Sequence, residues 1–258
     1  MKKLFLTMSL VAMVTMMMTS CMHFKLGDHG LNDSFVDNTP TQVHEVDKIT
    51  EMTSFSKVDV TGPFNVIVQQ GVANTVNVKG TVEQLEKMTI YVKNGELTIR
   101  SKNSKTDSHH FNGLQVYVTS PIYKTLELTG SGKITAPEGL TADDIVLDLT
   151  GSGHITLAKL KCNKLDIDLT GSGEITTGPT NANKVNTDLT GSGSISIDGL
   201  TCIDLDNDLT GSGSMTFSNI DVKNANSDVT GSGVIRLNGK VESNKKDATG
   251  SGKVLFNE

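Results

Sequence analysis

Carboxylates recur at one fixed place along the second half of the sequence. Six aspartates each stand two residues before a T-G-S-G tetrapeptide: Asp148, Asp168, Asp188, Asp208, Asp228 and Asp247. Regularly spaced carboxylates could bind Ca²⁺ or act as acids and bases in catalysis. The plainer interpretation is a solvated column, in which neighbouring hydroxyls and counterions reduce the repulsion between the carboxylates. We predict no metal site, because the nine-residue glycine-rich pattern of calcium-binding repeats is missing.

Histidine and cysteine add no clear ligand set or nucleophile. His109, His110 and His154 lie in polar surroundings and are interpreted as solvated. Cys162 and Cys202 are 40 residues apart, two periods of the repeat described below. If the periods stack, their Cα atoms are about 9.6 Å apart, beyond the roughly 7 Å limit for a disulfide. We therefore expect two free, buried thiols, no catalytic residue and no cofactor site.

Two classes of function remain for such a chain. Many pectin-degrading enzymes are β-helices that cut with clustered Asp, Lys or Arg, but likeness of fold is weak support for an activity. Here the aspartates form a uniform column, and Arg236 is the one arginine within the repeats. We therefore favour a non-catalytic binding or structural protein, with a pectinase-like enzyme as the alternative.

The charge balance limits the partners. The chain has 23 Lys and Arg against 29 Asp and Glu, a net charge of −6. An acidic chain is a poor match for nucleic acid, which requires a basic face. Aromatic residues make up 4% and Trp is absent, so a surface that stacks bases or sugars is not expected.

The tetrapeptide T-G-S-G defines the architecture. It occurs seven times and begins at Thr129, Thr150, Thr170, Thr190, Thr210, Thr230 and Thr249. A constant period near 20 residues indicates a solenoid. Apolar residues stand at odd distances from each threonine, as Leu149 and Ile155 do around Thr150. This alternation is typical of strands with one buried face, and it leaves the aspartates and the Thr and Ser hydroxyls outside.

The two glycines of each motif fall on the inward parity. We interpret them as a corner of the coil where no side chain fits. A phosphate cradle is the alternative, but no helix follows the glycines and no Lys stands in the P-loop position. A third apolar segment contains Leu160 and Cys162. Three short strands per period predict a parallel β-helix with coils about 4.8 Å apart.

The region before the repeats is also rich in predicted strands. Residues 57–68, KVDVTGPFNVIV, align with the repeat as a degenerate copy, and Asn94-Gly95 is a predicted hairpin turn. Residues 82–88 are expected to form one or two helical turns that cover one end of the stack. At the other end we expect either charged residues such as Lys253 and Glu258 or another subunit to protect the edge.

The N-terminus predicts secretion and a lipid anchor. Lys2 and Lys3 precede an apolar run of about 15 residues, which fits a secretory signal. The sequence MTSC resembles the lipobox of bacterial lipoproteins, with Cys21 as the lipidated residue, although the commoner form has Leu at the place of Met18 and Gly or Ala at that of Ser20. We therefore expect a leader over residues 1–20, a tether over 21–48 and a β-helix over 49–258, with TGSG repeats from 126.

The iterated L-T-G-S-G-x-I, the leader and the stretch VDVTGPFNVIVQQG together resemble the bacterial family of autotransporter adhesin head GIN domains, DUF2807. The resemblance covers about residues 50–258. It implies a right-handed parallel β-helix, and an envelope lipoprotein of the type common in Bacteroidetes, anchored in the outer membrane and adhesin-like. It implies no catalytic residue, and the ligand and the face of the membrane stay open.

Overall fold

The protein folds as a parallel β-helix, as the repeat predicts. The computed structural model describes residues 45–103 and 108–257, within a compact unit that spans residues 42–258. The leader, Cys21 and most of the expected tether lie outside the described residues. Among the residues that are described, no helix is long and apolar enough to cross a bilayer.

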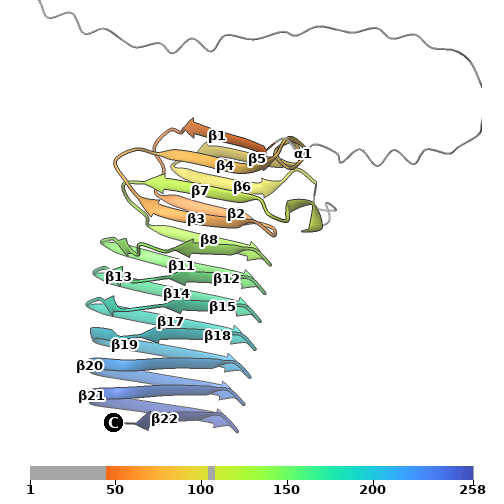
Figure 1. Cartoon of the computed structure of the whole chain (residues 1–258). Coiled ribbons are helices and arrows are strands. Elements are labelled where there is room, and N and C mark those ends of the chain that lie inside the picture. Colours follow the sequence, from red (N-terminus) through yellow and green to blue (C-terminus); the bar gives the residue numbers. More distant parts are fainter. Residues whose placement is uncertain (1–44, 104–107, 258) are drawn as a thin grey trace, which may run out of the picture. The chain divides into compact units, whose positions relative to one another are not determined.

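The coils of the β-helix run around a common core (Figure 1), and each of the first three contains three separate strands. The first four coils consist of β8 (Thr125–Gly130), β9 (Lys133–Ala136) and β10 (Leu140–Thr141); β11 (Asp144–Gly151), β12 (His154–Leu157) and β13 (Leu160–Lys161); β14 (Lys164–Gly171), β15 (Glu174–Thr177) and β16 (Thr180–Asn181); and β17 (Lys184–Gly191) with β18 (Ser194–Asp198). The remaining strands continue around corners: β19 (Leu200–Gly211), β20 (Ser214–Gly231), β21 (Val234–Gly250) and β22 (Lys253–Asn257).

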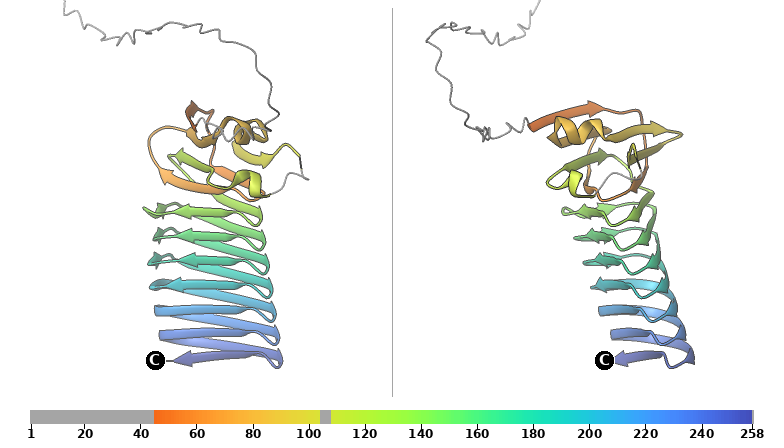
Figure 2. Two further views of the ribbon diagram at one scale, coloured as in Figure 1. Left: turned by 45° about the vertical axis from the view of Figure 1, so that its right-hand side comes forward. Right: turned by 90° about the vertical axis from the view of Figure 1, so that its right-hand side faces the viewer.

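Equal places in successive coils pair with each other in parallel. Thr150 pairs with Thr129 and Thr170, and the same register continues through the later motifs. The coils therefore lie directly on one another, as Figure 2 shows from two sides. We call the sheet of β8, β11, β14, β17 and the carboxyl-terminal parts of β19, β20 and β21 the first sheet. The second begins with β9 and the third with β10.

The core is filled by the odd places of the repeat. Leu149, Leu169 and Leu189 are each at most 1% exposed, and the isoleucines of the second sheet are also buried. Stacking identical aliphatic side chains removes a continuous column of apolar surface from water, at roughly 25 cal/mol per Å². A single 20-residue coil could not bury its inner face alone, so the stack is the unit of stability.

The N-terminal strands extend the same sheets. These elements are β1 (Glu45–Glu51), β2 (Lys57–Thr61), β3 (Asn65–Gln70), β4 (Thr75–Thr81), α1 (Val82–Glu86), β5 (Met88–Lys93), β6 (Glu96–Ser101), a 3₁₀ turn (Ser108–Phe111) and β7 (Gln115–Ser120). Strand β2 pairs in register with β8, so that Thr61 lies beside Thr129, and β3 pairs with β9. The degenerate copy of the repeat is thus a real coil, with Phe64 fully buried at the place of the second glycine.

The expected end of the stack is built from antiparallel strands and a short helix. Strands β5 and β6 form a hairpin in which Asn94 and Gly95 both have positive φ, and β1 and β7 pair antiparallel with β4. Helix α1 begins at a capping box of Thr81 and Gln84, and Leu85 packs against the core. These elements replace parallel coils at this end, as the prediction of a cap required.

At the opposite end, the first-sheet strand of the last described coil is exposed at its inward places. Asn244, Lys246 and Ala248 pair with the buried Ala225, Ser227 and Val229 of the coil before, but are exposed themselves. The ammonium of Lys246 lies 5.5 Å from the centre of the Phe256 ring. Of the charged residues expected to protect this edge, Lys253 is exposed on β22, and Glu258 lies outside the described residues.

Candidate functional site

A column of carboxylates runs along the outside of the first sheet. The paired positions are Asp59, Glu127, Asp148, Asp168, Asp188, Asp208, Asp228 and Asp247, in that order. We call these eight residues the carboxylate ladder. Neighbouring members lie on adjacent strands, about 4.8 Å apart at the backbone. The ladder is two residues longer than the sequence analysis proposed.

Both added members could have been found from the sequence. Glu127 stands two residues before Thr129, and Asp59 stands two residues before Thr61. The signal was therefore the same offset that identified the six aspartates. It was missed because Glu replaces Asp in one case and the motif is degenerate in the other.

The surroundings of the ladder raise the pKa values of most of its members. Partial burial raises the pKa of Glu127, Asp148, Asp168, Asp188 and Asp208, and adjacent carboxylates raise it further for all of these except Asp148. Burial also raises the pKa of Asp59, although the Thr61 hydroxyl donates a hydrogen bond to its Oδ1 at 3.2 Å. The expected relief by hydroxyls is thus present at the degenerate coil.

The next outward column differs, because its acids have partners. Lys164 Nζ lies 2.7 Å from Asp166 Oδ2, and Lys184 Nζ lies 3.1 Å from Asp206 Oδ2. Asn186 donates to Asp166 at 2.7 Å. Since these lysines neutralise the second column, the net negative charge of the first sheet is concentrated along the ladder.

The T-G-S-G motif is a structural corner, as proposed. In Gly151 the φ angle is +125°, and a Cβ there would lie 2.5 Å from the carbonyl oxygen of Gly130. At Gly153 a Cβ would lie 2.7 Å from the Gly132 oxygen and 2.8 Å from Leu128 Cδ2. The first position therefore requires glycine both for its positive φ and for the close approach of the coils. The second position requires glycine for the close approach alone. The Thr150 and Ser152 side chains face solvent.

The two repeat cysteines are free but differ in burial. Cys202 is 6% exposed, whereas Cys162 is only partly buried, so the prediction of two buried thiols was wrong for Cys162. The reason is that β13 ends at Lys161 and Cys162 lies at the following corner. Burial first and a nearby aspartate second raise the pKa to about 11 for Cys162 and about 12 for Cys202. Cys21 lies outside the described residues.

The histidines do not assemble into a site within residues 45–103 and 108–257. His154 Nε2 lies 3.8 Å from Glu174 Oε2 in an exposed pair, and His109 and His110 are exposed in the 3₁₀ turn. No group of three His, Cys, Asp or Glu side chains in this part of the chain is arranged to hold a metal ion.

A buried polar column lies inside the carboxyl-terminal half of the first sheet, and the sequence analysis did not identify it. The inward place three residues before each motif is Leu147 and Ile167 in the early coils, then Thr187, Asn207 and Ser227. The last three are at most 1% exposed. Thr187 Oγ1 donates to Asn207 Oδ1 at 2.8 Å, and Asn207 Nδ2 donates to Ser227 Oγ at 2.9 Å.

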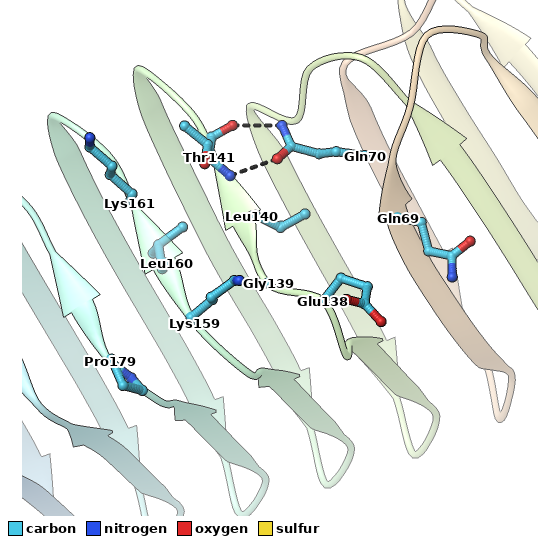
Figure 3. Close-up of a pocket in the computed structure, with 10 residues that line it drawn as sticks. All are labelled: Gln69, Gln70, Glu138, Gly139, Leu140, Thr141, Lys159, Leu160, Lys161 and Pro179. Carbon is cyan, nitrogen blue, oxygen red and sulfur yellow. Dashed lines mark hydrogen bonds between the residues drawn. The ribbon is translucent and has the colours of Figure 1, made fainter.

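A groove of about 720 Å³ lies where the third sheet begins (Figure 3). We call it the β10 groove, and its polar lining includes Gln69, Gln70, Glu138, Thr141, Lys159 and Lys161. The Gln70 side chain pairs with the Thr141 backbone, because Thr141 N donates to Oε1 at 2.7 Å and Nε2 donates to Thr141 O at 2.6 Å. The Gln70 side chain thus makes the two hydrogen bonds that the backbone of a neighbouring strand would otherwise make with Thr141.

Comparison with known proteins identifies one family and several solved structures with a similar fold. The family model described as "Putative auto-transporter adhesin, head GIN domain" matches residues 54–219. No curated protein matches the sequence significantly. A crystal structure of a putative adhesin from Bacteroides fragilis NCTC 9343 has a TM-score of 0.72 at 19% identity, covering 83% of this chain and 97% of that one.

Two structures from Parabacteroides distasonis ATCC 8503 are also similar. One is named a putative lipid binding protein, with a TM-score of 0.69 at 19% identity, and covers 83% of this chain and 97% of its own. The other is named a putative adhesin, with a TM-score of 0.66 at 24% identity, and covers 83% and 98%. At such identities they establish the fold alone. Since the family model covers more than half of the sequence, the chain belongs to the DUF2807 family of head GIN domains.

Proposed function

We propose that this chain is a non-catalytic, lipid-anchored binding module of the bacterial cell envelope, adhesin-like in role. Cys21 carries the lipid, the outer membrane holds the anchor, and the β-helix presents its surface to a protein, glycan or envelope partner. The observation that carries this proposal is the carboxylate ladder, a continuous anionic column on a rigid parallel sheet. The adhesin names of the family and of similar structures support it.

A ladder of this kind suits contact rather than catalysis. Each member has nearly the same surroundings as the next, because every coil repeats the same backbone. An enzyme needs a distinct constellation of nucleophile, acid and base at one place. A repeated surface instead meets a partner at many equivalent points, where electrostatic complementarity governs specificity and the rate of association.

Metabolic labelling with an alkyne analogue of palmitate tests the anchor. The wild-type chain should incorporate the label and fractionate with outer membranes. The Cys21→Ala variant should lose the label, whereas a Cys162→Ala/Cys202→Ala control should keep it. Label retained in Cys21→Ala, or absent from the wild type, contradicts the lipid anchor.

Binding to arrays of glycans and extracellular-matrix proteins tests the ladder. A variant with Asp148, Asp168, Asp188 and Asp208 changed to Asn should lose the binding of the wild type. A matched control with Asp143, Asp198, Asp221 and Glu242 changed to their amides has the same net charge and should keep it. No bound spot, or equal loss in both variants, contradicts the role of the ladder. Release of reducing or unsaturated products from polygalacturonate would contradict a non-catalytic role.

A further inference from the structure

The β10 groove exists because one coil lacks its third strand. After β3 the chain turns away at Gly71 into β4, so that among the described residues no third-sheet strand follows β3. Strand β10 pairs with β13 on one side, and on its other side the Gln70 side chain closes the Thr141 backbone. A peptide therefore cannot pair with Thr141 unless it displaces Gln70.

Two lysines of the groove have no acidic partner in the described part of the chain. Lys159 and Lys161 flank the buried Leu160, and both are exposed on the outside of the third sheet. Neither forms an ion pair with a described residue, in contrast to Lys164 and Lys184. Figure 3 shows the Lys159 side chain extending toward Gly139, whose missing Cβ leaves room for the lysine stem.

The remaining lining offers both donors and acceptors. Glu138 is exposed and has no cationic partner among the described residues, and the Gln69 side chain also borders the groove. Leu140 and Leu160 lie beneath, at 3% and 2% exposure. Two cations, a carboxylate and an amide over an aliphatic floor are suited to a ligand that has both negative charge and hydroxyl groups.

We propose that the β10 groove binds an acidic oligosaccharide. A uronate carboxylate meets Lys159 and Lys161, and sugar hydroxyls donate to Glu138 and accept from the Gln69 amide. The carboxylate ladder lies on another sheet and repels polyanions, which steers such a ligand to the groove. An acidic peptide is the less suitable ligand, because Gln70 already occupies the main-chain groups of Thr141. This inference goes beyond the proposed function, since it concerns a surface other than the carboxylate ladder.

Titration calorimetry on the full-length chain tests the proposal. In EDTA, to prevent Ca²⁺ bridging at the ladder, tetragalacturonate or a hyaluronan tetrasaccharide should bind saturably, and neutral maltotetraose should not. Lys159→Gln/Lys161→Gln should weaken binding at least tenfold. The control Lys133→Gln/Lys253→Gln removes the same charge from exposed places outside the groove and should change the affinity by less than twofold.

Several outcomes would overturn the assignment. They are no saturable binding of either acidic saccharide, equal binding of maltotetraose, or equal weakening in the two lysine variants. Displacement of the saccharide by an oligoglutamate at equal concentration would identify an anionic peptide site instead. Circular dichroism melting of each variant separates loss of binding from loss of fold. Glu138→Gln gives a second check. It should weaken binding, because the carboxylate accepts from sugar hydroxyls. If charge attraction alone held the saccharide, removing this negative charge would strengthen binding instead.

Discussion

At the scale of single residues, the ladder and the glycines act in opposite directions on stability. The T-G-S-G glycines from Gly151 onward permit a close approach between coils that a Cβ would prevent. The ladder places like charges about 4.8 Å apart, and each such pair costs roughly 0.9 kcal/mol in a water-like dielectric before salt screening. A charge column that opposes folding is consistent with a use in recognition.

Neutralising one member of the ladder should stabilise the protein. Asp168 has a raised pKa, first through burial and then through Asp148 and Asp166. The folded state then holds its proton more tightly than the unfolded state, so stability falls as the pH rises through the folded pKa. We expect Asp168→Asn to add roughly 0.5–1 kcal/mol at pH 7, and this gain should shrink toward pH 4.

Urea denaturation at both pH values measures this difference. Glu138→Gln, which removes an exposed carboxylate away from the ladder, serves as the control and should change stability little. A gain that is absent at pH 7, or larger at pH 4 than at pH 7, would show that the ladder does not destabilise the fold.

Substituting the first glycine of a motif should be costly. Gly151→Ala adds a Cβ at 2.5 Å from the Gly130 oxygen and requires a φ of +125°, which together cost roughly 3–5 kcal/mol. Gly95→Ala is the matched control, because Gly95 also has positive φ, +77°, but open space around it. It should cost only about 1–2 kcal/mol. Equal costs in urea denaturation would mean that coil contact is unimportant at Gly151.

At the scale of elements, the inward face of the first sheet changes character along the stack. Its early coils carry Leu147 and Ile167, and the later ones carry the hydrogen-bonded Thr187, Asn207 and Ser227. Aliphatic columns tolerate a slip of one coil, since every coil presents the same side chains. A polar column with specific partners does not, because a slipped coil would leave buried donors and acceptors unpaired.

Asn207 is the central member of this column and the clearest test of it. Asn207→Ala removes the amide that bonds both hydroxyls and leaves Thr187 only the Met215 sulfur at 3.5 Å. We expect a loss of roughly 2–4 kcal/mol. The triple variant Thr187→Val/Asn207→Leu/Ser227→Ala removes the polar groups together and should recover most of the stability. Denaturant titration measures both. A triple variant as unstable as the single one would contradict the assignment of the cost to unpaired polar groups.

At the scale of the whole described unit, stability should vary along the stack. Interior coils have neighbours on both sides, whereas the last described coil has exposed Asn244, Lys246 and Ala248 at its inward places. In a solenoid each coil is stabilised mainly by its two neighbours, so the terminal coil should open first.

Hydrogen exchange read by mass spectrometry tests this gradient. Amides within residues 240–257 should exchange at least tenfold faster than those within residues 164–191. The antiparallel β5–β6 hairpin and β1 provide an internal comparison at the other end. Uniform protection along all coils would indicate that the stack opens only as one cooperative unit.

Much of the fold was predictable from local sequence. The period and the alternation predicted parallel coils and their inward and outward faces. Local sequence predicted the hairpin at Asn94-Gly95 and the helical turns within residues 82–88, of which 82–86 form α1. The reason is that each coil contacts its own equivalents, so the spatial neighbours of a residue can be read from the repeat. The candidate site was predictable to the same degree: the outward aspartates follow from parity, and six of the eight ladder members were found.

Features that do not follow the 20-residue period were decided by the tertiary structure. The β10 groove depends on a strand that is missing from one coil and on Gln70, which is 71 residues from Thr141. The partial exposure of Cys162 depends on where a two-residue strand ends, and the pairing within Thr187, Asn207 and Ser227 depends on rotamers in a packed core. The sequence alone thus determined the stacking, because it is periodic; the groove and the buried polar contacts arise where that periodicity fails, and there only the folded chain brings the partners together.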